Sequence, residues 1–560
     1  MNSVEAGTHG RAKAFILLLI VLAVYVLAVQ HFWFVCDDAF ISFRYARNLA
    51  AGHGLRYNLG DHVPVEGYSN FAWVLVCAGL EYVGFDVTLW APVLSFISGA
   101  VLLWSVWRFS LVRLGLAPPV ALATTLVLAL FPPFALWSTG GMATMPSALT
   151  FFAAFALVTS ADRPSLRARF GGAALILILV LLRVDGIVWA AVLAAAGIFV
   201  GAAGRREFWR RAAIPACAVV GGLLIYLAWR HAYHGGLIAN TVIVKGGLTV
   251  SRLAKGGKYA AVFFLTFVTP LAIVLGAVCS AKRWGRLGAA VSGVFIATVG
   301  YSILVGGDFM AMGRLLVLGI PFLAISMGCL LQRVWERSGT RRVAILSVTV
   351  VAIVLLGALP AWNIHVVPRA ARSAFHFRLS TPVFRSEIEQ WRNMRRNSER
   401  WEVIGRALRE HGGAGDSPAT LVAGNIGNIG YYSDLFIYDL CGLVSPEVAA
   451  LPVRQGLSPG HDRAVSPWFF FDRDPTYFYA RLVEEPRVAQ SVLAHLREWR
   501  APLAEIPYAP DLIRIPTAHS GSPRRALFLC RRLRPGESKG KAWEAFRAKF
   551  EEIAGTRLSQ

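Results

Sequence analysis

The sequence predicts a polytopic α-helical membrane protein with a C-terminal soluble α/β domain, and three observations support this. First, the 560 residues are 56% hydrophobic and only 16% charged, whereas a soluble chain is about a quarter charged. Second, most apolar residues fall in runs of membrane length. Third, the composition becomes charged from about Asn363 onward. We therefore predict a transmembrane domain at 1–362, with a first outward loop at 36–88, and a soluble extracytoplasmic domain at 363–560.

The apolar runs predict about eleven membrane-spanning helices. The first run follows Arg11 and Lys13 and ends without a small-residue cleavage pattern, which favours an uncleaved helix over a signal peptide. Phe71–Phe85 is short for a span and suits a re-entrant or interfacial helix. The predicted spans lie at approximately 14–35, 89–112, 117–137, 145–161, 172–182, 186–202, 213–230, 260–280, 289–305, 316–331 and 343–362.

The positive charge of the chain supports this topology. The net charge is +23, and many of the Arg and Lys residues stand in short clusters between apolar runs, as the positive-inside rule requires of cytoplasmic loops. This location argues against nucleic-acid binding. With Phe71–Phe85 left out of the spans, the basic clusters share one side with the N-terminus. We expect a multi-pass protein of the bacterial plasma (inner) membrane. The outward segments are then 36–88, 138–144, 183–185, 231–259, 306–315 and everything after 362.

The soluble domain is expected to mix helices and strands. Apolar spacing predicts a helix over Ser386–His411 and a terminal helix over Trp543–Ile553. Strand-like runs occur at Thr420–Ala423, Leu435–Leu440 and Arg525–Cys530. The Gly/Asn-rich segment between the first two strands is expected to be a turn.

Charged residues beside membrane segments are costly and therefore indicate function. Asp37 and Asp38 stand where the first helix leaves the membrane. Two adjacent carboxylates repel each other, so one of them can have a raised pKa and accept a proton, or the pair can bind a divalent cation. Arg44 and Arg47 follow one helical turn apart, a spacing that presents two guanidinium groups to one phosphate. The competing interpretation is a helix cap at a membrane exit.

Other outward loops carry polar residues that simple connectors do not need. Arg183 and Asp185 interrupt an apolar stretch, and Asp308 and Arg314 precede the next span. Each of these also fits a local ion pair or turn. Further candidates are Asn58, Glu66, Asn240 and Lys245. Together they predict a polar pocket at one face of the membrane.

These segments resemble a known family. The run Asp37-Asp38-x-x-Ile41-x-x-Arg44-x-x-Arg47-Asn48, with Gly52-x-Gly54, Asn58-x-Gly60 and Val65-Glu66, resembles the first periplasmic loop of the terminal β-(1→2)-arabinofuranosyltransferase of the mycobacterial cell wall and its bacterial relatives. Gly306-Gly307-Asp308-Phe309-Met310 with Arg314, and Tyr431-Tyr432-Ser433-Asp434 through Asp439 and Gly442-Leu443, resemble two further motifs. Relatives have Gly-Leu-Glu-Thr where this chain has Gly141-Met142-Ala143-Thr144, so a carboxylate is missing at Ala143.

The resemblance implies a GT-C glycosyltransferase that takes a sugar, with arabinofuranose favoured, from a polyprenyl-phosphate donor. The acceptor would be a glycan or another cell-envelope molecule on the outer face of the lipid bilayer. We expect Asp37 or Asp38 to be the catalytic carboxylate. Arg44, Arg47, Arg183, Lys245 and Arg314 are the donor-phosphate candidates. The candidates for binding sugar or acceptor are Asn58, Glu66, Asp185, Asn240 and Asp308.

Three alternatives remain open at the level of sequence. One is the same chemistry with another sugar, transferred to lipid or to a pilin-like protein. The others are a membrane transporter and a non-catalytic assembly protein. A transporter should show internal repeats and charges near the bilayer midplane, but we find no repeat and the charges cluster at one face. The sequence has no zinc-binding array, P-loop or nucleophile elbow, which leaves a divalent cation on the Asp pair as the possible cofactor.

Overall fold

The computed structural model describes residues 2–160, 165–201, 205–244, 249–362, 368–378, 384–412, 419–452, 463–484, 487–516 and 525–555. Its contacts divide the chain into two compact units. The membrane unit contains Met1–Cys36 and Ser69–Arg395, and the C-terminal unit contains Asp37–Tyr68, Arg396–Arg454 and Arg463–Gln560. The sequence had grouped all of 36–88 with the transmembrane domain. The contacts place Asp37–Tyr68 in the C-terminal unit instead, because its side chains bond to residues near position 430.

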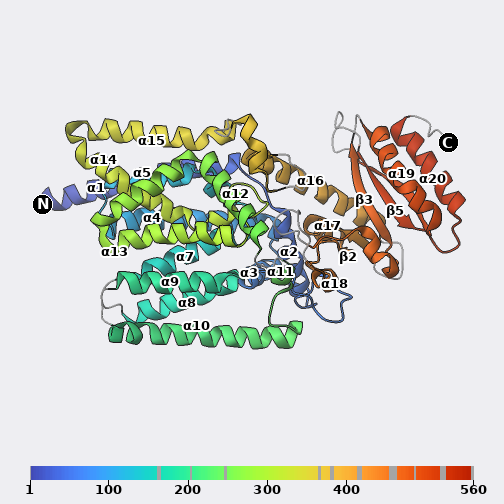
Figure 1. Cartoon of the computed structure of the whole chain (residues 1–560), viewed down its shortest axis with the longest axis horizontal. Coiled ribbons are helices and arrows are strands. Elements are labelled where there is room, and N and C mark those ends of the chain that lie inside the picture. The colour runs from blue at the N-terminus through green and yellow to red at the C-terminus, as the bar shows by residue number, and fades with distance from the viewer. Residues whose placement is uncertain are drawn as a thin grey trace. The chain divides into compact units, whose positions relative to one another are not determined.

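The membrane unit is a bundle of helices (Figure 1). Long neighbouring helices pack side by side, and short loops join them. The α-helices of this unit are α1 (Asn2–His31), α3 (Phe71–Tyr82), α4 (Val87–Val112), α5 (Pro118–Leu130), α6 (Pro132–Trp137), α7 (Thr144–Val158), α8 (Leu166–Leu182), α9 (Gly186–Val200), α10 (Arg205–His234), α11 (Asn240–Val244), α12 (Val250–Thr266), α13 (Val268–Leu304), α14 (Ile320–Arg337) and α15 (Arg342–Ala358).

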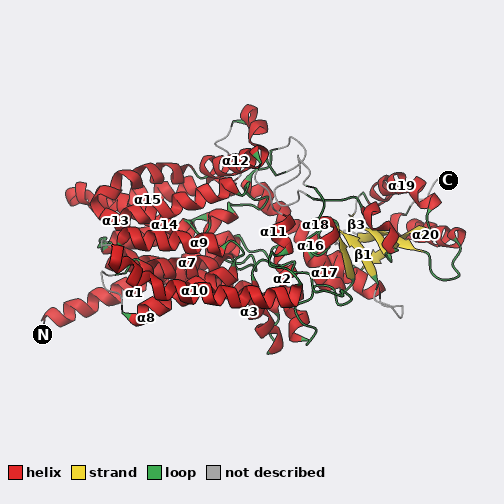
Figure 2. Cartoon of the chain, turned by 60° about the horizontal axis from the view of Figure 1, so that its bottom comes forward, coloured by secondary structure: helices red, strands yellow, loops and turns green. Residues whose placement is uncertain are grey.

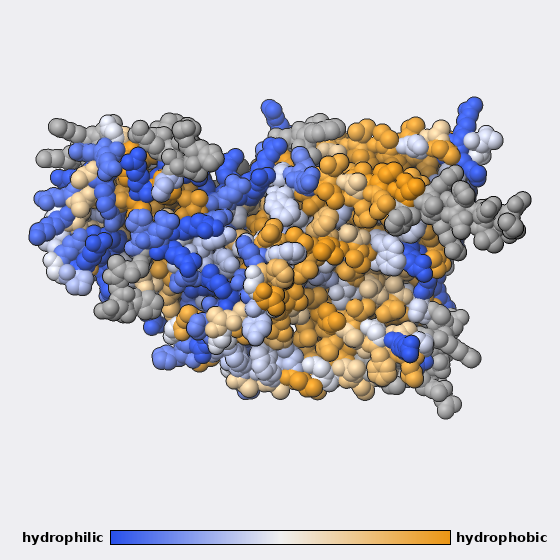
Figure 3. Space-filling view, turned by 180° about the vertical axis from the view of Figure 1, so that it is seen from behind, coloured by the Kyte–Doolittle hydropathy of each residue, from blue (hydrophilic) through white to orange (hydrophobic). Residues whose placement is uncertain are grey.

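The surface of the membrane unit is that of an integral membrane protein. Hydrophobic side chains dominate its exposed face in Figure 3. Within the described residues, four helices are long and apolar enough to cross a bilayer, namely Val87–Val112, Ala216–His234, Arg283–Leu304 and Gly339–Ala358. Shorter apolar helices accompany them, among them Pro118–Leu130, Thr144–Val158 and Gly186–Val200. The predicted apolar runs coincide with helices, and the predicted helical membrane fold is confirmed.

Two of the predicted runs are not continuous helices. The run 117–137 breaks at Phe131, which has extended backbone angles before Pro132, because a residue before proline is disfavoured in the helical region. The run 260–280 breaks at Phe267, between α12 and α13. A further kink lies at Gly285 inside α13, where φ is 57°, a backbone conformation that glycine adopts without strain.

The C-terminal unit is built on a five-stranded mixed sheet, drawn in yellow in Figure 2. The strand order is β2-β1-β3-β5-β4. Strand β1 pairs in parallel with β2 and β3, whereas β5 pairs antiparallel with β3 and β4. The strands are β1 (Thr420–Ala423), β2 (Phe436–Asp439), β3 (Tyr477–Glu484), β4 (Tyr508–Ile515) and β5 (Arg525–Arg532).

Helices α19 (Val488–Glu505) and α20 (Lys539–Ala554) pack on this sheet and form its core. Leu496 and Trp499 of α19 and Phe546 of α20 share one buried cluster with Phe478 and Phe528 of the strands. The unit also contains α2 (Asp37–Ala50), α17 (Gly427–Ser433) and α18 (Pro446–Ala449), while α16 (Glu387–Gly412) has residues in both units. The predicted α/β character of this part of the chain is thus confirmed.

The predicted elements of the soluble domain are largely observed. The helix at Ser386–His411, all three strands and the terminal helix appear as α16, β1, β2, β5 and α20. The turn expected in the Gly/Asn-rich segment was wrong, because Gly427–Ser433 forms the helix α17. Strands β3 and β4 and helix α19 were not predicted, since their apolar spacing is masked by interspersed arginines and prolines.

The glycines of α17 allow this helix to lie directly against α2. A Cβ atom at Gly427 would stand 1.9 Å from the backbone oxygen of Asp37, and one at Gly430 would stand 1.8 Å from the Tyr57 hydroxyl. No side chain fits at such distances. The glycines of this segment are therefore needed for the close contact between the two helices. This explains why a segment with the composition of a turn forms a helix.

We predict that Gly427→Ala destabilises the C-terminal unit by about 1–3 kcal/mol or more, because the clash is with rigid backbone. Thermal unfolding of the purified protein measures this loss. Gly424→Ala is the matched control, since the nearest atom to its Cβ would be 3.7 Å away. Equal melting temperatures for the two variants would contradict the close packing of α17 on α2.

Candidate active site

Asp37, at the start of α2, is held in a fixed orientation by α17. Its Oδ1 atom accepts hydrogen bonds from the backbone N–H of Asn428 at 2.7 Å and from the Asn428 side-chain amide at 3.1 Å. The same amide donates to Ser398 Oγ at 2.8 Å, which fixes the Asn428 side chain. Burial raises the pKa of Asp37 to about 6, against the lowering effect of the Asn428 bonds, and the neighbouring charge of Asp38 raises it further.

This combination fits a proton acceptor. A general base works best with a pKa near the operating pH and with an orienting partner on its second oxygen. Asp38 differs from Asp37 because its carboxylate has no hydrogen-bond partner among the described residues. The expectation that one member of the pair has a raised pKa is met at Asp37.

Arg44 lies about two turns further along α2, and its guanidinium bonds to backbone carbonyls. Its guanidinium donates to the carbonyl oxygens of Tyr57 at 2.8 Å, Gly430 at 2.7 Å and Leu435 at 2.7 Å. It also covers the Tyr57 ring at 4.2 Å, and the residue is 3% exposed. These contacts favour a structural role for Arg44 over the phosphate binding expected from the sequence.

We predict that Arg44→Ala lowers the free energy of unfolding by about 3 kcal/mol or more, because three buried carbonyls lose their donor. The control is Arg47→Ala, whose partner Asp434 is 41% exposed and whose loss should cost about 1 kcal/mol or less. Thermal unfolding compares the two. An unchanged melting temperature for Arg44→Ala together with weaker donor binding would instead support the phosphate role.

The remaining first-loop candidates also belong to the C-terminal unit, and two of them bond to its other segments. Arg47 pairs with Asp434 and lies over the Tyr431 ring at 4.4 Å. The Asn58 side chain exchanges two 3.0 Å hydrogen bonds with the backbone of Ile437 in β2. Glu66 is buried. Arg47 and Asn58 thus connect the first loop to α17 and its flanking residue Asp434 and to strand β2.

The membrane unit holds the second group of candidates as two arginine–aspartate pairs. Between α8 and α9, Arg183 donates from Nε and Nη2 to both oxygens of Asp185, each at 2.7 Å. In the loop after α13, Arg314 Nε donates to Asp308 Oδ2 at 2.5 Å. The charges of Arg183 and Arg314 lie within electrostatic reach of each other. The two pairs are separated by over a hundred residues in sequence, and we call them together the arginine cluster.

Arg183 has more donors than its carboxylate partner uses. A guanidinium has five N–H groups, and a carboxylate on its Nε edge uses two at most. The side chains of Arg183 and Arg314 are 18% and 15% exposed, so both are largely withdrawn from water. A guanidinium in such a place is suited to a phosphate, because charge-assisted bonds strengthen as water is excluded.

The last candidates from the sequence are Asn240 and Lys245, together with the substituted position Ala143. Asn240 begins the short helix α11 and is buried. Lys245 lies outside the described residues. Ala143, where relatives carry a carboxylate, precedes α7 and is buried. Its neighbour Met142 accepts a contact from Arg314 Nη1 at 3.4 Å through its sulfur. Ala143, the position where relatives carry the carboxylate, is therefore adjacent in sequence to a residue that contacts Arg314.

The arrangement of potential metal ligands in the described residues gives no support to metal binding. Among the described residues, no group of three or more His, Cys, Asp or Glu side chains is arranged to hold an ion. Asp37 already accepts two bonds from Asn428. Binding of a divalent cation to Asp37 and Asp38 stays a prediction, and the described residues offer no cluster that would add further ligands.

Sequence reasoning missed two groups of residues. Asn428 was counted only as part of a Gly/Asn-rich turn, although its spacing from two glycines was visible. Arg378 and Glu387, which bond to the loop that carries Asp308, were missed because nothing in their local sequence separates them from other charged residues near the start of the soluble domain.

The fold is that of a helical integral membrane protein with a C-terminal α/β part. The chain is similar in structure to ArnT from Cupriavidus metallidurans. The apo crystal structure of ArnT superimposes with a TM-score of 0.57 at 14% identity, over 93% of this chain and 98% of ArnT. The crystal structure of ArnT bound to undecaprenyl phosphate gives 0.56 at 13% identity, over 92% and 98%. At these identities the likeness concerns the fold.

Sequence comparison adds one match. Residues 388–521 match a family described as a domain of unknown function, DUF8728. This region runs from α16 into the segment after β4. No curated protein matches the sequence.

Proposed function

We propose that this protein is a membrane glycosyltransferase that moves a sugar from a polyprenyl-phosphate donor to a cell-envelope acceptor on the extracytoplasmic face of the inner membrane. The observation that carries the proposal is the pair of Arg–Asp contacts, Arg183–Asp185 and Arg314–Asp308, brought together on a GT-C fold. A lipid donor needs its phosphate held by cations at the membrane boundary while its tail stays in the bilayer.

The proposed reaction uses one proton acceptor. The acceptor hydroxyl oxygen forms a bond to the anomeric carbon, and the bond from this carbon to the phosphate oxygen breaks. The polyprenyl phosphate leaves with the bonding electrons, and Asp37 takes the hydroxyl proton. Arg183 and Arg314 balance the charge that grows on the departing phosphate. The fixed orientation and raised pKa of Asp37 support this role.

Arabinofuranose is the sugar that we propose, with a glycan as acceptor. The support is the ordered set of motifs around Asp37, Asp308 and Asp434 that resembles the terminal arabinofuranosyltransferases. Ala143, in place of the usual Glu, is the departure that bears on the choice of sugar. A different pentose or hexose would leave the same roles for Asp37, Arg183 and Arg314.

The test is transfer by the purified protein in lipid nanodiscs. Polyprenyl-phosphate arabinofuranose, other pentoses and hexoses are supplied in parallel with short glycan acceptors, and products are identified by mass spectrometry. A pentose added from the arabinofuranose donor alone supports the full proposal, and transfer of another sugar supports the enzyme class and corrects the sugar. The configuration of the product, read by NMR, separates retention, which the resemblance implies, from inversion, which a single carboxylate base favours. An absence of transfer from every donor would overturn the proposal.

A further inference from the structure

We propose that Arg378 and Glu387 are positioning residues that fix the conformation of the loop Asp308–Arg314. Both side chains are almost fully buried in the membrane unit, with 4% and 3% exposure. They form an ion pair with each other, and each also bonds to the backbone of the loop. We call these contacts of Arg378 and Glu387 with the loop the clamp. The effect of the clamp on donor binding rests on the proposed function, whereas the clamp itself does not.

The backbone of the loop is strained at Met312. Met312 has a left-handed backbone with φ of 57°, and Gly306, Gly307 and Gly313 also have positive φ values. A non-glycine residue in this region costs free energy and persists only where its surroundings impose it. Met312 is fully buried, so the surrounding contacts must supply that constraint.

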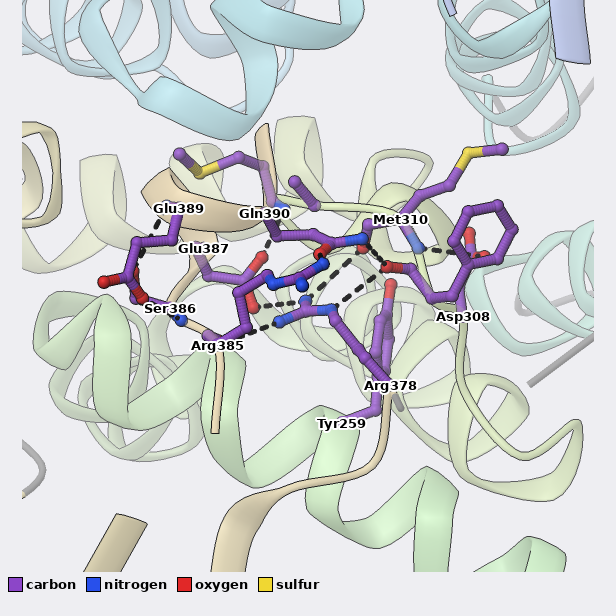
Figure 4. Close-up of polar contacts among 12 residues, drawn as sticks. Tyr259, Asp308, Met310, Arg378, Arg385, Ser386, Glu387, Glu389 and Gln390 are labelled. Carbon is purple, nitrogen blue, oxygen red and sulfur yellow. Dashed lines mark hydrogen bonds and ion pairs between the residues drawn. The ribbon is translucent and has the colours of Figure 1, made fainter. Parts of the chain in front are cut away.

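Side chains from the segment 378–394 supply it by bonding to successive backbone groups (Figure 4). Arg378 donates to the carbonyl oxygens of Phe309 at 3.1 Å and Met310 at 3.4 Å. Glu387 accepts from the backbone N–H of Met312. Gln390 donates to the same Phe309 oxygen at 2.9 Å.

Further contacts complete the arrangement. The sulfur of Met394 accepts from the Ala311 N–H at 3.4 Å, and Trp137 donates to the Ala311 oxygen at 3.1 Å. At its two ends the loop carries Asp308 and Arg314, which pair with each other. The position of the Arg314 guanidinium is therefore set by backbone that Arg378 and Glu387 hold.

Cys36 offers a readout that does not depend on catalysis. The residue is 3% exposed, and its thiol lies 3.9 Å from the sulfur of Met310. Release of the loop should uncover this thiol. Cys77 in α3 and Cys329 in α14 are also buried but belong to helices away from the loop sequence, so they report on general unfolding.

The experiment measures maleimide labelling of each cysteine by mass spectrometry in the full-length protein. In Arg378→Ala we expect Cys36 to react at least about tenfold faster than in the wild type, with Cys77 and Cys329 unchanged, because local opening exposes only nearby groups. Arg378→Lys should restore part of the protection by keeping the charge opposite Glu387. Arg531→Ala, which breaks a buried pair with Asp511 in the other unit, is the matched control and should leave Cys36 protected.

Gln390→Ala serves where Arg378→Ala fails to fold, because it removes a neutral amide and leaves the buried Arg378–Glu387 ion pair in place. It should give the same pattern at smaller amplitude. A Cys36 rate equal to wild type in these variants, or a parallel rise at all three cysteines, would overturn the clamp. The donor KM should rise together with the Cys36 rate. Faster Cys36 labelling in a protein that transfers no sugar at all would support the clamp and reject the proposed function.

Discussion

Asp37→Asn is expected to lower turnover by about 10²- to 10⁴-fold, the usual loss when a general base is removed. The asparagine keeps an oxygen that can accept both bonds from Asn428. The folded structure should therefore survive, and the melting temperature should not fall. Burial raises the pKa of Asp37, so replacing its carboxylate with a neutral amide also relieves a desolvation cost. Turnover is measured at saturating donor and acceptor, with thermal unfolding on the same sample.

Asp38→Asn is the matched control for this prediction. Asp38 raises the pKa of Asp37 through its charge, and the base must be deprotonated to act. Loss of Asp38 should therefore lower the pKa of Asp37 and move the acid limb of the pH–rate profile to lower pH, with much of the turnover retained. Full activity in Asp37→Asn, with a large loss in Asp38→Asn, would move the catalytic role to Asp38.

The membrane fold could be predicted because the bilayer imposes a simple rule on the sequence. A span needs a long apolar run, and such runs were visible at Val87–Val112 and Gly339–Ala358. The breaks at Phe131 and Phe267 were harder to predict. Pro132 and Pro133 gave a signal at the first break, and Pro270, in the first turn of α13, gave one at the second.

The candidate residues were easier to identify than their roles. Charge beside apolar runs marked Asp37, Arg44 and Arg314, yet Arg44 turned out to bond to backbone carbonyls that are nearly 400 residues away in sequence. Partners at that separation leave no local pattern. Arg378 and Glu387 were missed for the same reason. Their role depends on contacts with the loop Asp308–Arg314, which is distant in sequence, and not on adjacent residues.

The clearest separation of donor binding from proton transfer should come from Arg314. In Arg314→Ala we expect kcat/KM for the donor to fall by about 10²- to 10³-fold, because a charge-assisted contact to phosphate is lost in a largely buried site. The KM for the donor should carry a substantial part of that loss, whereas Asp37→Asn acts on kcat.

Two further variants show whether the loss comes from the phosphate contact or from the buried carboxylate left behind. Arg314→Lys keeps the charge but loses the fork of the guanidinium, so it should fall between wild type and alanine. Arg314→Ala combined with Asp308→Asn removes the stranded charge of Asp308, which is 6% exposed in its side chain. This double variant should recover stability without recovering donor affinity. Recovery of both would show that Arg314 serves only to neutralise Asp308, and the phosphate role would then pass to Arg183.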